Sequence, residues 1–257
     1  MASINYVTGA SGFLGSHLIK RLNNVVSIPH DKLSTIKLEP FDNVYFLSAY
    51  GNMFDQTDDG KIIQANLVDL VSIFKQVQNF NFKSFVYIST SSVLLPVQTT
   101  YSKSKKMAED FLSFYIEELH LPVAIVRPFS IVGCGEQLEH LIPKLISSCM
   151  HDEEIDFVPE STHDFVDVED VVRGILYLSK NQKQGIFEIG NGRAYSNQEV
   201  LKLVEKCTGY KAKIKIVKSM RPYDSKKWQA TKIQWFKKLK PRTLEQTITN
   251  MVRVYGN

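Results

Sequence analysis

Short apolar runs alternate along the chain with longer stretches of helical periodicity. Five apolar runs predict buried strands, and they lie at residues 5–8, 25–28, 44–47, 85–88 and 123–126. Apolar residues recur at helical spacing over 16–22, 62–77 and 107–119, which predicts three helices. Strands that alternate with helices in this way predict an α/β fold with a doubly wound parallel sheet.

The composition fits one large domain, or a main domain with a small appendage. The chain has 257 residues, of which 44% are hydrophobic and 23% charged. No apolar run is long enough to span a bilayer, and the first residues lack the basic start of a signal peptide. Cys134, Cys149 and Cys207 form no CxxC pair, which is typical of a reducing compartment. We therefore expect a cytoplasmic protein without a metal site.

Charge is unevenly distributed along the chain. The net charge is +4, yet residues 202–242 contain twelve lysines and two arginines against only Glu205 and Asp224. A basic segment on an acidic body indicates an anionic partner, either a phosphate-bearing ligand or a nucleic acid. The alternative is an ordinary solvated surface.

Three glycines follow the first predicted strand directly. Gly9 permits a tight turn, Gly12 lets the backbone approach a pyrophosphate, and Gly15 allows the next helix to pack closely on the strand. The start of that helix offers free N–H groups to phosphates. The strand, turn and helix together predict a dinucleotide site, which includes Ser11, Phe13 and Leu14.

The residue that contacts the adenosine ribose is expected about 20 positions after the first glycine. This place holds His30, Asp31 and Lys32. Asp31 suits ribose hydroxyls and therefore NAD, whereas His30 and Lys32 suit the 2′-phosphate of NADP. The sequence leaves both cofactors open.

Tyr101 and Lys105 lie four residues apart at the start of the third predicted helix, so they share a face with Ala108, Leu112, Tyr115 and Leu119. This apolar face predicts that Lys105 is buried. A nearby ammonium favours the phenolate, so we expect Lys105 to lower the pKa of Tyr101 and make it a general acid–base. Ser89–Ser92 follow the fourth strand, where ligands of open α/β sheets collect and a hydroxyl polarises a carbonyl.

These residues resemble the extended short-chain dehydrogenases/reductases, specifically the NAD-dependent epimerase/dehydratase family that acts on nucleotide sugars. The similar segments are 7–17, 46–49, 86–93, 126–133, 163–170, 187–192 and 221–224. The resemblance implies catalysis by Thr90, Tyr101 and Lys105. It implies further cofactor contacts from Leu47, Ser48, Ala49, Asn66, Ile88 and Pro128, with Tyr101 and Lys105. It implies substrate contacts from Tyr50, Ser91, Ser130, His163 and Arg221, the last of which holds the diphosphate in relatives.

The resemblance also implies a Rossmann-type NAD(P)-binding domain over 1–130, with 165–182 packing back onto it. A smaller substrate-binding region would cover 131–164 and 183–257. The chain departs from the family pattern in two short stretches, 28–44 and 90–101. In the first of them we expect one unit of the sheet to be trimmed or lost. Ser91 and Ser92 stand where dehydratases carry an acidic pair, which argues against a 4,6-dehydratase.

The resemblance predicts an NAD(P)-dependent enzyme that acts on a nucleoside-diphosphate sugar, at C4, through a 4-keto species. We favour an epimerase over an NADP-dependent 4-ketosugar reductase. A non-catalytic dinucleotide sensor and a nucleic-acid binder are the other candidates. Relatives dimerise through the helix that carries the tyrosine and lysine, and Phe114 could serve such a homodimer interface.

Overall fold

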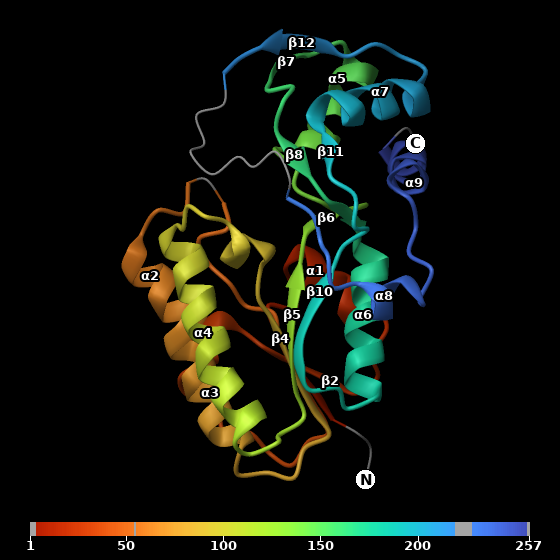
Figure 1. The fold of residues 1–257 in the computed structure, drawn as a ribbon. Helices are drawn as coiled ribbons and strands as arrows, with labels where there is room; N and C mark the ends of the chain where they lie inside the picture. The colour runs from red at the N-terminus through yellow and green to blue at the C-terminus, as the bar shows by residue number, and fades with distance from the viewer. Residues whose placement is uncertain (1–3, 54, 219–227, 256–257) are drawn as a thin grey trace. The chain divides into compact units, whose positions relative to one another are not determined.

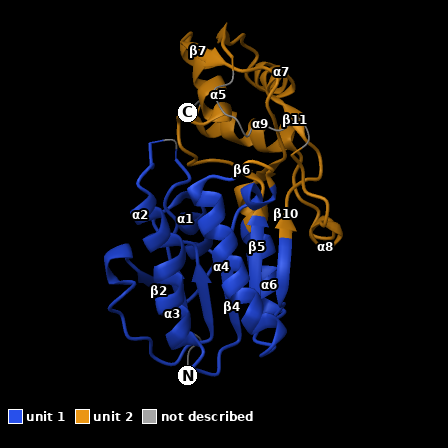
Figure 2. Ribbon diagram, turned by 60° about the vertical axis from the view of Figure 1, so that its left-hand side comes forward, with its two compact units in different colours: residues 1–94, 98–127, 172–187 blue, residues 95–97, 128–171, 188–257 orange. Residues whose placement is uncertain are grey.

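The structure is a computed structural model that describes residues 4–53, 55–218 and 228–255. The chain forms two compact units, which have separate colours in Figure 2. The first unit comprises residues 1–94, 98–127 and 172–187, and the second comprises 95–97, 128–171 and 188–257.

A six-stranded sheet forms the centre of the first unit. Its strands follow the order β10-β5-β4-β3-β1-β2. They are β1 (Asn5–Thr8), β2 (Val25–Ile28), β3 (Asn43–Phe46), β4 (Ser84–Ile88), β5 (Val123–Pro128) and β10 (Gly185–Ile189). The pairs from β2 to β5 are all parallel, which confirms the predicted fold class. The order of strands reverses between β1 and β3, where open α/β sheets bind their ligands.

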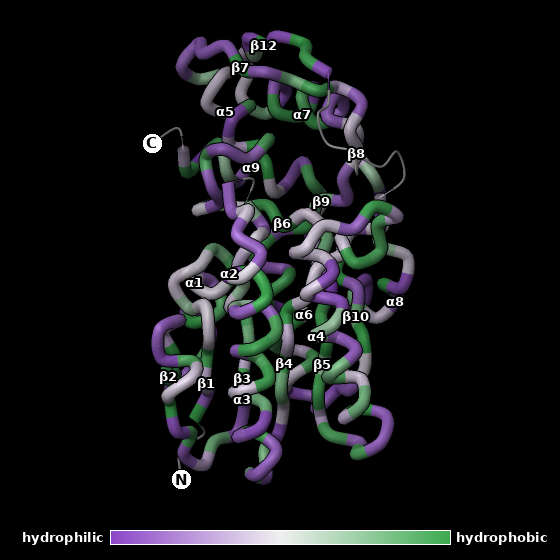
Figure 3. The backbone as a smooth tube through the Cα atoms, turned by 90° about the vertical axis from the view of Figure 1, so that its left-hand side faces the viewer, coloured by the Kyte–Doolittle hydropathy of each residue, from purple (hydrophilic) through white to green (hydrophobic). Residues whose placement is uncertain are grey.

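Helices cover both faces of this sheet (Figure 1). They are α1 (Phe13–Ile19), α2 (Asp59–Ile63), the π-helix η2 (Gln64–Val68), α3 (Asp69–Val77), α4 (Thr100–Glu117) and α6 (Val168–Lys180). Helices α3 and α4 lie on one face of the sheet and α1 lies on the other (Figure 1). The core under α3 and α4 includes Phe74, Phe85 and Leu112, and Figure 3 shows the hydrophobic course of β4 and β5.

The predicted elements of the first unit are present with shifted ends. The predicted helix 62–77 is three segments, α2, η2 and α3, and α4 begins earlier than its periodicity predicted. Thr99 caps α4, because its hydroxyl accepts the Ser102 N–H and Ser102 Oγ accepts the Thr99 N–H at 2.8 Å. Leu119 was wrongly placed on the buried stripe. Since α4 ends at Glu117, Leu119 is 53% exposed.

The stretch between β2 and β3 is short, as the sequence predicted. It contains only the 3₁₀ turn η1 (His30–Lys32), with no α-helix or strand. The short 3₁₀ turn η3 (Ser91–Leu94) alone separates β4 from α4. The stretches that follow β2 and β4 are therefore both compact.

Among its described residues, the second unit contains three two-stranded sheets and the helices α5, α7, α8 and α9. Its strands are β6 (Ser130–Val132), β7 (Glu154–Phe157), β8 (Thr162–His163), β9 (Phe165–Asp167), β11 (Tyr195–Ser196) and β12 (Lys213–Ile216). Its helices are α5 (Leu141–His151), α7 (Asn197–Thr208), α8 (Gln234–Lys237) and α9 (Leu244–Tyr255). The apolar faces of α5, α7 and α9 share one core, which includes Leu145, Val200 and Ile248. Within the described residues, no helix combines the length and apolar character that crossing a membrane requires.

Candidate active site

The glycine turn after β1 is tightly built. Gly9 has φ +65°, and the Gly12 N–H donates to the Gly9 carbonyl at 3.1 Å. A Cβ on Gly15 would lie 2.1 Å from the same carbonyl oxygen, so only glycine fits there. Ser11 and Gly12 are exposed, while Phe13 and Leu14 are partly buried in α1. The turn therefore presents its backbone to solvent at the point where the sheet order reverses.

The end of β3 lies directly against this turn. The Thr8 hydroxyl accepts the N–H groups of Leu47 and Ser48, both at 3.0 Å. A Cβ on Gly9 would lie 2.9 Å from the Ser48 nitrogen. The segment continues through the exposed Ala49 to Tyr50. The structure thus brings together the glycine turn after β1 and the segment after β3, both of which the resemblance assigned to the cofactor.

Asn66, a predicted cofactor contact, makes three hydrogen bonds within the chain. It is fully buried in η2, and its side-chain oxygen accepts the Tyr50 N–H at 3.0 Å. Its amide N–H groups donate to the Tyr50 carbonyl at 2.8 Å and to Ser104 Oγ at 2.9 Å. Because both ends of the amide are engaged within the chain, Asn66 holds the loop after β3 against α4. The π-helix that places it there is a feature that often marks functional positions.

Thr90, Tyr101 and Lys105 meet at the carboxyl end of β4. The Thr90 side chain hydrogen-bonds Tyr101, and Thr90 Oγ1 is 2.9 Å from Ser92 Oγ. Lys105 is 1% exposed, and its ammonium donates to the Ile88 carbonyl at 2.7 Å. The ammonium also lies 4.6 Å from the centre of the Tyr87 ring. The predicted burial of Lys105 is therefore confirmed.

The predicted effect of Lys105 on Tyr101 is wrong in this structure. Burial raises the pKa of Tyr101 to about 12, although the hydrogen bond from Thr90 opposes the shift. Burial also lowers the pKa of Lys105 to about 7, against the attraction of Glu109. Desolvation outweighs charge attraction here, because both polar heads lie where water is largely excluded. Of these two groups, only the lysine titrates near neutrality.

The turn η1 places His30, Asp31 and Lys32 on the surface beyond β2. Asp31 and Lys32 form an exposed ion pair at 3.8 Å, and His30 Nδ1 lies 3.6 Å from Asp69 Oδ2. An acidic and a basic side chain are therefore both exposed beside the expected position of the adenosine ribose. The choice between NAD and NADP stays open.

The predicted substrate residues are divided between the two units. In the first unit, Tyr50 is partly exposed and Ser91 is buried in η3. In the second, Ser130 Oγ lies 3.3 Å from His163 Nδ1, and Pro128 is buried. The His163 ring packs 5.6 Å from both Phe165 and Trp228, measured between centroids. Arg221 lies outside the described residues.

Sequence reasoning missed a buried ion pair beside Lys105. Glu109 is fully buried and binds Arg127 through both carboxylate oxygens. The signal was present, because Glu109 follows Lys105 by four residues and so continues the face of α4 that carries Tyr101. An acidic residue on a buried face requires a partner.

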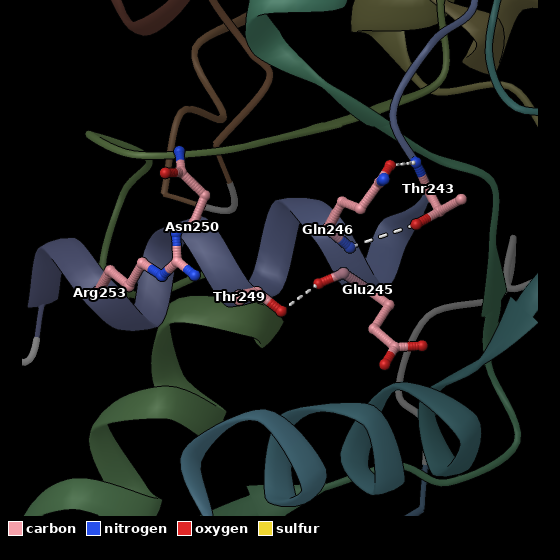
Figure 4. Close-up of a pocket in the computed structure, with 6 residues that line it drawn as sticks. All are labelled: Thr243, Glu245, Gln246, Thr249, Asn250 and Arg253. Carbon is pink, nitrogen blue, oxygen red and sulfur yellow. Dashed lines mark hydrogen bonds between the residues drawn. The ribbon is translucent and has the colours of Figure 1, made fainter.

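Two surface pockets contain none of the predicted site residues. One, of about 420 Å³, is lined by a polar face of α9 with Thr243, Glu245, Gln246, Thr249, Asn250 and Arg253 (Figure 4). The other, of about 520 Å³, lies at the amino ends of β1 and β3, where Asn5, Asn43 and Ser179 are joined by hydrogen bonds. Most polar side chains that line these two pockets already form hydrogen bonds or ion pairs within the chain.

Comparisons with known proteins converge on one family. The sequence pattern described as "NAD dependent epimerase/dehydratase family" matches residues 29–190. A dTDP-D-glucose 4,6-dehydratase of Dictyostelium discoideum is 24% identical over 264 residues, which cover 77% of this chain and 60% of that protein. The dTDP-D-glucose 4,6-dehydratase of Bos taurus is 28% identical over 237 residues, covering 72% and 67%. This chain thus spans about three fifths of the length of the first of these relatives.

The fold is shared with solved structures over almost the whole chain. A UDP-N-acetylglucosamine 4-epimerase from Methanobrevibacter ruminantium M1 superposes with a TM-score of 0.88 at 20% identity, covering 99% of each chain. The agreement shows that the short loops of this chain leave the common fold intact.

The close contact between Gly15 and Gly9 predicts that any side chain at residue 15 destabilises the fold. Gly15→Ala should lower the free energy of unfolding by about 3 kcal/mol, because a Cβ clashes with backbone that cannot move aside. Urea unfolding measures this change. Gly60→Ala, within α2, is the matched control and should be neutral or stabilising. Equal stability of Gly15→Ala and the parent would contradict the geometry.

The burial of Lys105 predicts a specific dependence of stability on pH. The ordinary lysine pKa of 10.5 applies to the unfolded chain, whereas folded Lys105 titrates near 7. Between these values the unfolded state binds more protons, so the contribution of Lys105 to the free energy of unfolding rises with pH by a few kcal/mol. Below about pH 7 its contribution is constant and at its least favourable.

Lys105→Met should therefore lose this rise between pH 7 and pH 10, while Lys103→Met, on the exposed face of α4, should keep it. Urea unfolding at a series of pH values measures both. A parallel pH dependence of Lys105→Met and the parent would show that Lys105 does not titrate in this range.

Proposed function

Because this chain belongs to the NAD-dependent epimerase/dehydratase family, we propose that it is an NAD(P)-dependent enzyme that epimerises C4 of the sugar in a nucleoside-diphosphate sugar. The observation that carries the proposal is the assembly of Thr90, Tyr101 and Lys105 at the end of β4. A glycine turn with no room for side chains lies at the reversal point of the same sheet. Solved 4-epimerases share the fold.

The residues present fit a dinucleotide. The exposed backbone of Ser11 and Gly12 suits a pyrophosphate, and the segment Leu47–Ala49 borders the same turn. Ile88, Pro128 and the turn η1 are further predicted contacts. The nicotinamide supplies the hydride chemistry when it is bound, and the protein supplies orientation and proton transfer.

The chain's own residues divide the proton chemistry. Thr90 holds the reacting sugar oxygen by a hydrogen bond, and Tyr101 exchanges a proton with that oxygen. Burial raises the pKa of Tyr101 to about 12, so the phenol is protonated at neutral pH and can give its proton to the sugar oxygen. Lys105 carries its charge below about pH 7 and is neutral above it.

The residues after Thr90 favour epimerisation over water elimination. Ser91 and Ser92 provide hydroxyls where an elimination requires carboxyl groups to move protons, and Ser92 Oγ pairs with Thr90. In an epimerase, the 4-keto sugar rotates in the site between two hydride transfers. This rotation requires no further acid next to Thr90. The curated dehydratases that match this chain therefore differ from it in the proposed reaction.

Tyr101→Phe tests the proposed acid–base directly. Loss of the phenolic hydroxyl should lower the turnover of a nucleoside-diphosphate sugar by about 10²–10⁴-fold while dinucleotide binding persists. Tyr115→Phe, on the same helix, is the matched control and should retain turnover. Turnover and dinucleotide affinity are measured on the same preparations.

Two outcomes would contradict the proposal. Retained turnover of Tyr101→Phe would remove the assigned acid–base. Dinucleotide binding without turnover in the parent protein would favour a sensor instead.

The same proposal includes a homodimer formed through the outer face of α4. Met107 and Phe114 lie seven residues apart on that face and are 51% and 55% exposed, and Val68 of the adjacent η2 is also exposed. An apolar helix face of this kind suits a second copy of the chain in a twofold interface.

Phe114→Glu should therefore shift the molar mass in light scattering from dimer toward monomer. Leu138→Glu, at another exposed apolar position, should leave the mass unchanged. A monomeric parent protein would exclude the interface.

In the proposed function, the two compact units bind different ligands. We assign the dinucleotide to the first unit and sugar recognition to Ser130, His163 and Arg221, which belong to the second part of the chain. A cytoplasmic location completes the proposal, in line with three cysteines that are all free thiols.

A further inference from the structure

A buried ion pair lies one helical turn from Lys105 in the first unit. Glu109 Oε1 accepts Arg127 Nε at 2.8 Å, and Glu109 Oε2 accepts Arg127 Nη2 at 2.6 Å. Glu109 is fully buried, and the Arg127 side chain is 14% exposed. Arg127 belongs to β5 and Glu109 to α4, so the pair joins two neighbouring elements of the site.

Lys105 and Glu109 are spaced for an ion pair with each other, yet each binds a different partner. A lysine and a glutamate four residues apart on a helix readily form an ion pair, and low dielectric strengthens the attraction. Here the Lys105 ammonium donates to the Ile88 carbonyl instead. Both Glu109 oxygens face Arg127, whose planar guanidinium matches a carboxylate with two parallel hydrogen bonds.

We propose that Arg127 is a positioning residue for Lys105. By engaging both oxygens of Glu109, it prevents Glu109 from drawing the ammonium along α4 and leaves that ammonium at Ile88, beside Thr90 and Tyr101. The catalytic part of this inference rests on the proposed function, whereas the geometric part depends only on the fold.

The groups that surround Lys105 support this role. Glu109 acts on it from α4, Tyr87 lies against it from β4, and Arg127 reaches it through Glu109 from β5. Tyr101, on α4, interacts with the same Tyr87. Glu109 raises the pKa of Lys105 against the larger effect of burial. A direct ion pair would raise this pKa much further and would hold the proton on Lys105 at every working pH.

The test detects the titration of Lys105 by measuring how the free energy of unfolding changes with pH. In each background, the pH dependence of unfolding is compared between the chain with Lys105 and the same chain with Lys105→Met. In the parent, the difference rises with pH from about 7. In Arg127→Met the rise should disappear, because Glu109 then pairs with Lys105 and keeps its folded pKa at or above the ordinary lysine value of 10.5, so that the unfolded state no longer binds more protons.

The double variant Arg127→Met/Glu109→Gln removes both charges of the pair and supplies the rescue. It should restore a rise that begins at or below pH 7, and it should fold even if the single variant does not, since no buried charge is left unpaired. Arg127→Lys, which holds a carboxylate through one ammonium, should give an intermediate onset. Arg242→Met removes an arginine from the pair with Asp167 in the second unit and should leave the titration of Lys105 unchanged.

Activity provides the second readout. Arg127→Met should lower kcat/KM by about 10²-fold, because a displacement of about 1 Å has this effect, and the double variant should recover most of the loss. An unaltered Lys105 titration in Arg127→Met, or no recovery in the double variant, would overturn the proposal. Absence of turnover in the parent would refute the proposed function and leave the stability result to decide the geometric claim.

Discussion

The site depends on the burial of one ammonium group between α4 and β4. Lys105 reaches the Ile88 carbonyl across the Tyr87 ring, and this contact ties the first turns of α4 to the end of β4. Such a charge is costly to bury, and its cost is visible in a pKa near 7. The Thr99 cap and the Asn66 amide hold α4 and the neighbouring loop in the position that this contact requires.

Compact loops surround this contact without disturbing it. The stretch between β2 and β3 contains only a 3₁₀ turn, and another such turn links β4 to α4. The sheet nevertheless keeps its parallel pairing and its reversal point between β1 and β3. Both short stretches follow the carboxyl ends of strands, β2 and β4, where ligands of open α/β sheets bind, and the contact of Lys105 with Ile88 is kept beside the second of them. In the proposed function, these two short turns border the adenosine ribose and the sugar.

Local patterns in the sequence predicted the fold class, the glycine turn and the burial of Lys105. Each of these depends on residues close in the chain, such as the four-residue spacing of Tyr101 and Lys105. The π-helix at Asn66 and the pKa of Tyr101 were not predictable, because they arise from contacts between distant segments and from exclusion of water. Leu119 was misplaced because periodicity alone does not mark where α4 ends. Only one member of the Glu109–Arg127 ion pair could be inferred from the sequence. Its spacing from Lys105 places Glu109 on the buried face of α4, but no local pattern identifies Arg127 on β5 as its partner.

The nucleotide that co-purifies with the protein tests the central claim most directly. An epimerase regenerates its cofactor within each catalytic cycle, so the account predicts a dinucleotide retained through purification, near one per chain. Denaturing the protein and identifying the released nucleotide by mass spectrometry measures this. Retained NAD would support the epimerase. A protein that binds only dissociable NADP(H), or no dinucleotide at all, would contradict it.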